Sequence, residues 1–318
     1  MNPLRIGFLL PDLRHSRSYM PLVMQALIDA GVVVDVIHPT DRLIDLSMVR
    51  VEHDLYVLRQ MSGLAFSLAE ALHALGAAIV NPYPVSAALG DKIVTWRTLH
   101  AAGVPTPETY VASRVESLLP LLDAGPIVVK PYREGGGEGI RIVRTAAELA
   151  EVPRGREPIF AQRYHPPRGR DRKIYAIGGR LFGVKKVFPR HTEEEKQGEP
   201  FDLTPQLREI AARCGEAFGI DLYGVDIIES EDQPYVVDMF SIPGFKGVPN
   251  APLLLAQYFR AAAERASRGH WVDADKWRPA LAGPLDAGKW RSASAGPDVV
   301  GGGPTIESTA AALAARLE

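Results

Sequence analysis

The alternation of apolar and polar stretches near the start of the chain predicts a small open α/β domain. Four apolar runs and two helical patterns follow one another, in the order 4–10, 21–30, 32–37, 54–59, 62–75 and 77–80. Gly31 and Gly76 each end one of the helical patterns. Strand–helix–strand repeats favour parallel pairing of the strands. We therefore predict an N-terminal α/β domain over residues 1–85.

The pattern then changes to longer segments in which strands predominate. Two prolines within residues 81–84 interrupt the alternation, because proline fits neither a central strand nor the interior of a helix. A helical pattern follows over 85–102 and predicts one long linking helix. The next segments mix strands with single helices. We predict a domain over residues 86–265, with two lobes at about 105–162 and 163–265.

The periodicity is lost near the C-terminus. Residues 266–318 mix Gly, Pro, Trp, Asp and Lys without a regular pattern, which predicts an irregular extension. Within it, the Ala-rich stretch 306–317 is amphipathic and predicts a terminal helix with Thr305 as its N-cap. A charged run at 191–196 predicts a solvated loop near the acceptor site.

Composition narrows the class of protein. The 318 residues are 46% hydrophobic with a formal charge of −2, as in an ordinary globular protein without a nucleic-acid or acidic-membrane partner. No apolar stretch reaches the ~20 residues that a membrane span needs, and we expect a cytoplasmic protein. The single cysteine, Cys214, lies in an amphipathic helical pattern, which favours a buried apolar role.

Two lysines are candidates for phosphate binding. Lys130 ends an apolar run, and four of the five residues from 135 to 139 are glycines, whose N–H groups could close over an anion. The alternative is a hairpin turn with a solvated lysine. Lys92 lies at the start of the predicted linking helix, where it could face the same phosphates or be an ordinary surface lysine.

Charged residues also punctuate the later strands. Lys173 follows Asp171 on a predicted strand, and the return strand of a hairpin would bring Lys185 or Lys186 near it; an exposed basic strand edge is the alternative. Asp226 and Asp238 each lie in apolar runs, where burying a carboxylate is costly without a cation. On neighbouring antiparallel strands they would suit magnesium, and otherwise they are capped strand-end carboxylates.

Taken together and in this order, these segments resemble the ATP-grasp superfamily over roughly residues 1–260. The likeness is to the RimK-like branch of ribosomal-protein glutamate ligases, with a second likeness to the ATP-grasp inositol-phosphate kinases. It implies an α/β and α+β ATP-grasp fold behind an N-terminal open α/β domain. The matching segments are 91–92, 103–107, 129–131, 135–139, 159–164, 171–173, 224–226, 237–238 and 243–244.

The resemblance assigns the nucleotide contacts. It implies that Lys92 and Lys130 bind the phosphates of ATP, and that Gly135, Gly136 and Gly137 fold over the triphosphate. It also implies two cofactors, ATP and Mg²⁺.

The resemblance further implies an interlobe hinge at Gln162, Arg163 and Tyr164, whose backbone pairs with adenine. It places Asp171 and Lys173 at the nucleotide as well. Lys173 stands where ligases of this branch carry arginine, and a lysine there is more similar to the inositol kinases, because it keeps the charge without the bidentate fork.

The same resemblance also implies the metal ligands and the cations at the acyl centre. Asp226 and Asp238 are implied to hold magnesium, but Phe240 replaces the asparagine that the family pattern has two residues beyond the second acid. Phenylalanine cannot ligate a metal, so the expected second magnesium site is weakened. Lys173, Lys186 and Arg190 are candidates to stabilise charge at the reacting centre.

The resemblance implies a carboxylate–amine ligase that forms an amide through an acylphosphate and releases ADP and phosphate. A small-molecule kinase that phosphorylates a hydroxyl is the alternative suggested by Lys173. A nucleotide-binding protein with weakened catalysis is the alternative suggested by Phe240. The expected partners are ATP and a small carboxylate or hydroxyl acceptor. Homo-oligomers are common among similar proteins and are an open expectation here.

Overall fold

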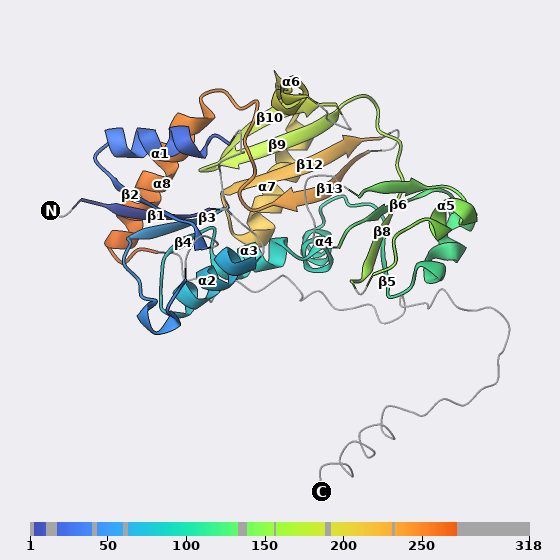
Figure 1. Cartoon of the computed structure of the whole chain (residues 1–318). Coiled ribbons are helices and arrows are strands. Elements are labelled where there is room, and N and C mark those ends of the chain that lie inside the picture. Colours follow the sequence, from blue (N-terminus) through green and yellow to red (C-terminus); the bar gives the residue numbers. More distant parts are fainter. Residues whose placement is uncertain are drawn as a thin grey trace, which may run out of the picture. The chain divides into compact units, whose positions relative to one another are not determined.

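The fold is seen in a computed structural model of the chain (Figure 1). It describes residues 3–10, 18–39, 43–59, 63–132, 139–155, 157–187, 192–230 and 233–271. All of these belong to one compact unit, Met1–Gly283. The predicted terminal helix at 306–317 is not among the described residues. Within the described ranges no helix combines the length and apolar character needed to cross a bilayer.

The first sheet confirms the predicted strand–helix–strand alternation. Its four strands are parallel and have the order β2-β1-β3-β4. All four residues of its third strand are buried, as expected for a parallel strand that is covered on both faces. In chain order the elements are β1 (Arg5–Leu9), α1 (Met20–Asp29), β2 (Val33–Ile37), η2 (Leu46–Met48), β3 (Leu55–Leu58), α2 (Gly63–Ala74) and β4 (Ile79–Val80).

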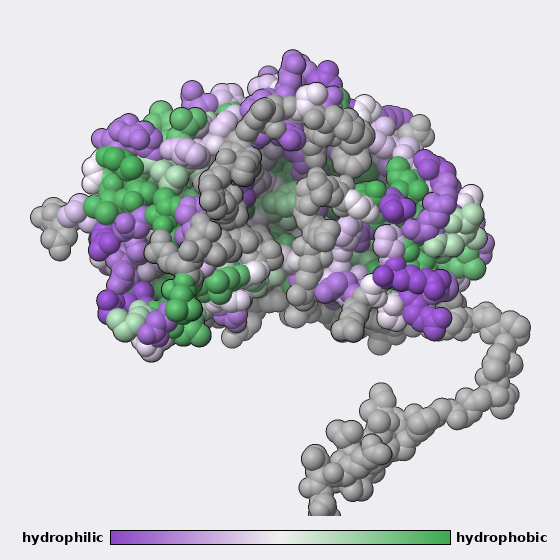
Figure 2. All heavy atoms as spheres, in the orientation of Figure 1, coloured by the Kyte–Doolittle hydropathy of each residue, from purple (hydrophilic) through white to green (hydrophobic). Residues whose placement is uncertain are grey.

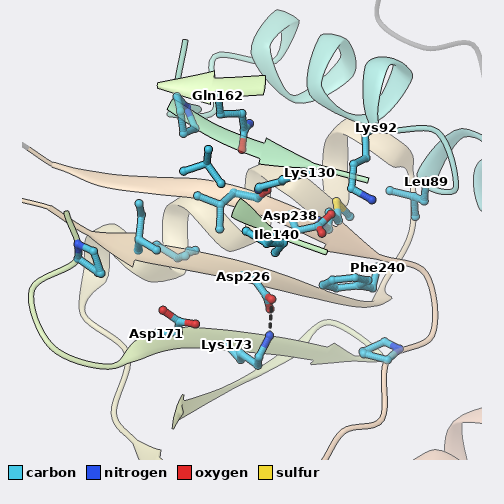
Figure 3. Close-up of a pocket in the computed structure, with 18 of the residues that line it drawn as sticks. Leu89, Lys92, Lys130, Ile140, Gln162, Asp171, Lys173, Asp226, Asp238 and Phe240 are labelled. Atoms are coloured by element: carbon cyan, nitrogen blue, oxygen red, sulfur yellow. Dashed lines mark hydrogen bonds and ion pairs between the residues drawn. The ribbon is translucent and has the colours of Figure 1, made fainter. Parts of the chain in front are cut away.

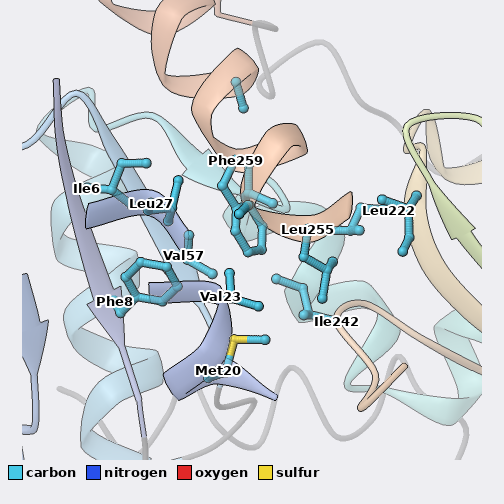
Figure 4. Close-up of a cluster of buried hydrophobic side chains, with 14 of the residues drawn as sticks. Ile6, Phe8, Met20, Val23, Leu27, Val57, Leu222, Ile242, Leu255 and Phe259 are labelled. Atoms are coloured by element: carbon cyan, nitrogen blue, oxygen red, sulfur yellow. The ribbon is translucent and has the colours of Figure 1, made fainter. Parts of the chain in front are cut away.

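A helix from far along the chain completes the core of this first domain. Helix α8 (Ala251–Ser267) packs against α1 and β3. The ring of Phe259 meets that of Phe8 edge to face, with 5.9 Å between centroids, and Figure 4 shows Leu255 and Val23 in the same cluster. The predicted division into domains stays a prediction, but this packing fixes the end of the second predicted domain against the first.

The predicted single helix over 85–102 is wrong in extent, because two helices occupy the segment. Helix α3 (Tyr83–Leu89) has Gly90 as its C-cap, and α4 (Lys92–Ala101) begins two residues after that glycine. Asp91 has extended backbone angles, and its side chain accepts hydrogen bonds from the N–H groups of Ile93 and Val94 at 2.9 and 3.2 Å. It is therefore the N-cap of the second helix, which a continuous helix would not allow.

The second sheet is antiparallel, with the order β5-β8-β6-β7. Its apolar face packs on a 3-10 helix and a short α-helix, with Ile127 and Val129 buried against Leu118 and Leu149. This side of the sheet forms a small core, so the opposite side is left to face the third sheet. Its elements are β5 (Thr109–Ala112), η3 (Val115–Ala124), β6 (Ile127–Lys130), β7 (Arg141–Val143), α5 (Ala146–Ala150) and β8 (Ile159–Arg163).

The third sheet is also antiparallel, with the order β11-β10-β9-β12-β13. Helix α7 packs its apolar stripe on it, begins at the N-cap Thr204 and ends at Gly219 in a left-handed conformation. Cys214 is buried in this stripe, as predicted. The elements are β9 (Asp171–Ile177), β10 (Arg180–Lys186), α6 (Glu193–Gln197), β11 (Glu199–Phe201), α7 (Pro205–Phe218), β12 (Leu222–Glu229) and β13 (Pro234–Phe240).

The charged run near residue 191 was predicted to be a loop, but from Thr192 onward it is a short helix. The Thr192 hydroxyl accepts a hydrogen bond from the N–H of Glu195, whose carboxylate accepts one from the N–H of Thr192. This capping box offsets the poor intrinsic stability of so short a helix. Its surface is hydrophilic, as Figure 2 shows at the top of the molecule.

Candidate active site

A cavity of about 810 Å³ lies between the second and third sheets. This volume is within the range of about 300–1,000 Å³ typical of small-molecule sites. Residues from β6 and β8 line one side, and residues from β9, β12 and β13 line the other (Figure 3). The lining includes nine predicted site residues: Lys92, Lys130, Gln162, Arg163, Tyr164, Asp171, Lys173, Asp226 and Asp238.

Two carboxylates lie side by side on the floor of this cavity. Asp226 of β12 is the register partner of Asp238 of β13, so the side chains share one face of the sheet. Burial raises the pKa of the Asp238 carboxyl, and the positive charges of Lys130 and Lys92 oppose that rise. The prediction that the two acids lie on neighbouring antiparallel strands is confirmed.

Lys130 reaches the same place from the opposite sheet. It is the last residue of β6 and is only 8% exposed, and its Nζ donates a 2.8 Å hydrogen bond to the carbonyl oxygen of Val237. Burial lowers the pKa of Lys130, while the nearby carboxylate of Asp238 opposes that effect. A buried cation whose hydrogen-bond acceptor among the described residues is a carbonyl oxygen can readily accept an anionic ligand.

Lys173 and Asp226 form a largely buried ion pair across strands β9 and β12. Their side chains are 10% and 21% exposed. The Nζ of Lys173 also lies 5.9 Å from the ring centroid of Phe240, which follows Asp238 on the same face of β13. Phe240 thus occupies the position beside the carboxylates where a polar side chain could have been a ligand.

The start of α4 brings Lys92 to the cavity. Because Asp91 is the N-cap, the next residue, Lys92, is in the first turn of the helix. The Asp91 carboxylate also accepts a hydrogen bond from the hydroxyl of Tyr132, two residues beyond Lys130. This bond ties the two lysine-bearing segments together, although 38 positions separate Lys92 from Lys130 in the sequence.

The predicted hinge is more firmly bound to its own lobe than expected. The guanidinium of Arg163 donates to the carbonyl oxygens of Leu121 and Gly125 at 3.0 and 2.7 Å. The backbone N–H groups of Arg163 and Tyr164 donate to carbonyl oxygens at 2.8 and 3.0 Å. Gln162 donates through its amide to Thr109 at 3.1 Å. Adenine pairing by this segment stays a prediction and would need other backbone groups than these two donors.

The charge of the cavity suits a triphosphate with its metal ion. Among the described lining residues, five basic side chains outnumber three acidic ones. Those described residues contain no group of three or more His, Cys, Asp or Glu able to hold a metal by themselves. Magnesium usually combines one or two carboxylates with substrate phosphates and water, and Asp226 with Asp238 meets that requirement. The residues present therefore fit ATP and Mg²⁺.

Comparison with known families agrees with this geometry. The sequence model of the RimK-like ATP-grasp domain matches residues 89–252, just over half of the 318 residues. The chain belongs to the RimK-like ATP-grasp family. The matched range covers the second and third sheets and contains every predicted site residue, so the resemblance drawn from the sequence is confirmed.

The RimK-like relatives include named ligases. A probable α-L-glutamate ligase of Aliivibrio salmonicida is 27% identical over 192 residues, 54% of this chain and 64% of the relative. The glutamate–LysW ligase ArgX of Sulfurisphaera tokodaii is 25% identical over 249 residues, 73% of this chain and 88% of the relative. The chain thus spans about two thirds or less of several curated relatives that it matches.

A solved structure supports the same fold. The RimK domain ATP-grasp protein from Sphaerobacter thermophilus superposes with a TM-score of 0.67 at 21% identity, covering 82% of this chain and 98% of that one. At this identity the likeness establishes the ATP-grasp fold and nothing about the substrates.

Four of the RimK-like site predictions fall on residues that the structure does not describe, namely Gly135, Gly136, Gly137 and Arg190. Lys186 is described but is not among the residues that line the cavity. Its buried Nζ donates to the hydroxyl of Tyr175 and to the carbonyl oxygen of Lys246, both at 3.0 Å. Tyr175 does line the cavity, so Lys186 lies one side chain behind it, and its catalytic role stays a prediction.

Arg59 lines the same cavity and was missed by the sequence analysis. It immediately follows β3 in the N-terminal sheet, and its backbone N–H donates to the carbonyl oxygen of Leu9. Open α/β sheets bind ligands at the carboxyl ends of their strands, so an arginine directly after an apolar strand was a usable signal.

Proposed function

We propose that this protein is an ATP- and Mg²⁺-dependent carboxylate–amine ligase. The observation that supports it best is the convergence of Lys130, Lys173, Asp226 and Asp238 on one cavity between two antiparallel sheets. Basic groups from two lobes would neutralise a triphosphate there, opposite two carboxylates that could hold its counter-ion. ATP-grasp ligases use ATP, and the named relatives are ligases.

In the proposed reaction a substrate carboxylate oxygen attacks the γ-phosphorus of ATP, giving an acylphosphate and ADP. An amine then attacks the acyl carbon, so that an amide and inorganic phosphate leave. Lys92 and Lys130 would bind the phosphates, and Asp226 with Asp238 would hold magnesium, which neutralises charge when it is bound. Lys173 would stabilise charge at the transferring phosphoryl group.

The proposed substrates follow the names of the relatives. Two of them are named for glutamate, so L-glutamate is the first substrate to test, both as the carboxylate and as the amine. The second substrate is to be found by screening, because only one of these two names gives a second substrate.

A paired assay tests the proposal. ADP release is measured with ATP, Mg²⁺ and pairs of amino acids, and the products are identified by mass spectrometry. An amide with one phosphate released per ADP supports the ligase, and Lys130→Met should abolish the signal. A stable phosphorylated product without free phosphate would instead establish the kinase reaction, which Lys173 in place of arginine favours. ATP binding without turnover on any pair would refute both activities.

A further inference from the structure

Arg59 differs from Lys130, Lys173 and Arg163 in having no side-chain partner among the described residues. Lys130 donates to a backbone carbonyl, Lys173 pairs with Asp226, and Arg163 is bonded to two carbonyls. The structure gives no hydrogen bond or ion pair from the Arg59 side chain to any described residue, and its Nε is buried without an acceptor. Burial lowers the pKa of Arg59, and no carboxylate of the described residues opposes that shift.

Such a cation is costly to keep in the absence of a ligand. Arg59 is partly exposed as a residue, but its Nε is shielded from solvent, and desolvating a charged donor without a partner opposes folding. Such a guanidinium suits an anion that is not part of the described chain. A guanidinium binds a carboxylate or a phosphate through two parallel hydrogen bonds.

Arg59 lies at the end of the cavity beside the loop after β13, and we call this the acceptor end. It comes from the N-terminal sheet, whereas the phosphate-binding lysines come from α4 and β6. A Cβ placed on Gly244, in the loop after β13, would lie 4.0 Å from its Nη2. The neighbouring Pro243 covers Gly224, which lies two residues before Asp226 on β12.

Figure 3 shows the hinge residue Gln162 at a distance from Phe240, the last residue of β13. Gln162 of the hinge and Phe240, which precedes this loop, lie on opposite sides of Asp238. A group bound at Arg59 would therefore approach the carboxylate pair from the side away from the hinge.

We propose that Arg59 binds a carboxylate of the substrate that is not ATP, and that this carboxylate is not the one that reacts. The inference rests on the proposed ligase function and restricts the substrates of that function. It requires a substrate with a second, free anionic group, as an amino acid with an acidic side chain has. A monocarboxylate without such a group would not use Arg59.

Steady-state kinetics with Arg59→Met and Arg59→Lys test this role, with ADP release as the signal and L-glutamate as the probe. Arg59→Met should raise the KM for L-glutamate about 10- to 100-fold, as expected for loss of a charge-assisted hydrogen-bond pair. Arg59→Lys should raise it less, and neither should change the KM for ATP. Arg208→Met, an exposed arginine on α7, is the matched control and should behave like wild type.

Two analogues identify the contacted group. L-glutamine lacks the side-chain carboxylate, and the α-amide of glutamate lacks the other. For one of the two analogues, the KM of wild type should be as high as the KM of Arg59→Met for L-glutamate. Arg59→Met should not raise the KM for that analogue any further. Equal effects of Arg59→Met on L-glutamate and on both analogues would overturn the proposal.

Thermal unfolding gives a readout that does not depend on turnover. Without ligand, Arg59→Met should unfold at the same or a higher temperature than wild type, because it removes a partly desolvated cation that has no anionic partner among the described residues; a clear decrease would overturn the proposal. L-glutamate should stabilise wild type and not Arg59→Met. If wild type releases no ADP with any amino acid, the ligase function fails. If no amino acid raises its unfolding temperature either, the carboxylate site fails as well.

Discussion

Asp226→Asn isolates the contribution of the Lys173–Asp226 pair to the stability of the free protein. Asparagine keeps the shape of the side chain and removes its charge, so the Lys173 ammonium loses its counter-ion. Lys173 is only 8% exposed and cannot turn fully into water. The variant therefore leaves a buried cation that has no carboxylate in ion-pair contact.

The expected loss can be worked from the burial of the pair. Breaking a fully buried ion pair by removing one partner costs about 3–5 kcal/mol. The side chains of Lys173 and Asp226 are 10% and 21% exposed, and solvent reaches the pair through the cavity. We therefore expect a smaller loss of unfolding free energy, of about 1–3 kcal/mol, which corresponds to a decrease of about 2–5 °C in Tm for a protein of this size.

A double-mutant cycle measures the pair itself. Thermal and urea unfolding are compared for wild type, Asp226→Asn, Lys173→Met and the double variant. Each single variant should lose stability, whereas the double variant should regain most of it, because no buried charge then remains unpaired. Strictly additive losses, or an Asp226→Asn variant as stable as wild type, would show that the two groups do not interact as the structure indicates.

Three further outcomes follow from the site. Phe240→Asn should lower the Mg²⁺ concentration for half-maximal ADP release several-fold, because it adds an oxygen ligand beside Asp238; Phe240→Leu is the control, and no difference between the two variants would refute the metal assignment. Lys130→Met should weaken ATP binding by about 10- to 100-fold in calorimetry, whereas unchanged affinity would remove Lys130 from the phosphate site. Burial raises the pKa of Cys214 to about 12, so its thiol should resist a disulfide reagent at pH 8 until urea unfolds the protein; rapid labelling of the native state would contradict this burial.

Local patterns were sufficient for the parts of the site that strands present. Lys130, Asp226 and Asp238 each lie in or at the end of an apolar run, and strand alternation and hairpin pairing bring them to one face. Local patterns were misread where two signals competed. The apolar periodicity over 85–102 concealed the Gly90-Asp91 break, although Asp91 is itself a good N-cap residue.

Other features depend on contacts that sequence periodicity does not encode. The packing of α8 on the first sheet joins segments separated by more than 200 residues, and it helps place the N-terminal domain beside the loop after β13. Arg59 reaches the cavity because the N-terminal domain is held there by this packing and by the hydrogen bonds of the Asn81 amide to the carbonyl oxygens of Leu222 and Ser241. The bonds of the Arg163 side chain to Leu121 and Gly125 likewise depend on where a 3-10 helix ends.

The Lys173–Asp226 pair also constrains how ATP and magnesium would bind together. Each member has a proposed ligand of opposite charge, the phosphates for Lys173 and the metal for Asp226, so the pair competes with both ligands for charge. The ammonium has further N–H donors and the carboxylate a second oxygen, so a ligand weakens the pair without having to break it, and the first ligand to bind meets most of that cost. The second ligand then finds its protein partner less tightly held, which favours joint over separate binding. Phe240 supplies no oxygen to the metal ion. This coupling and the phosphate oxygens would therefore have to hold the ion without a third protein ligand.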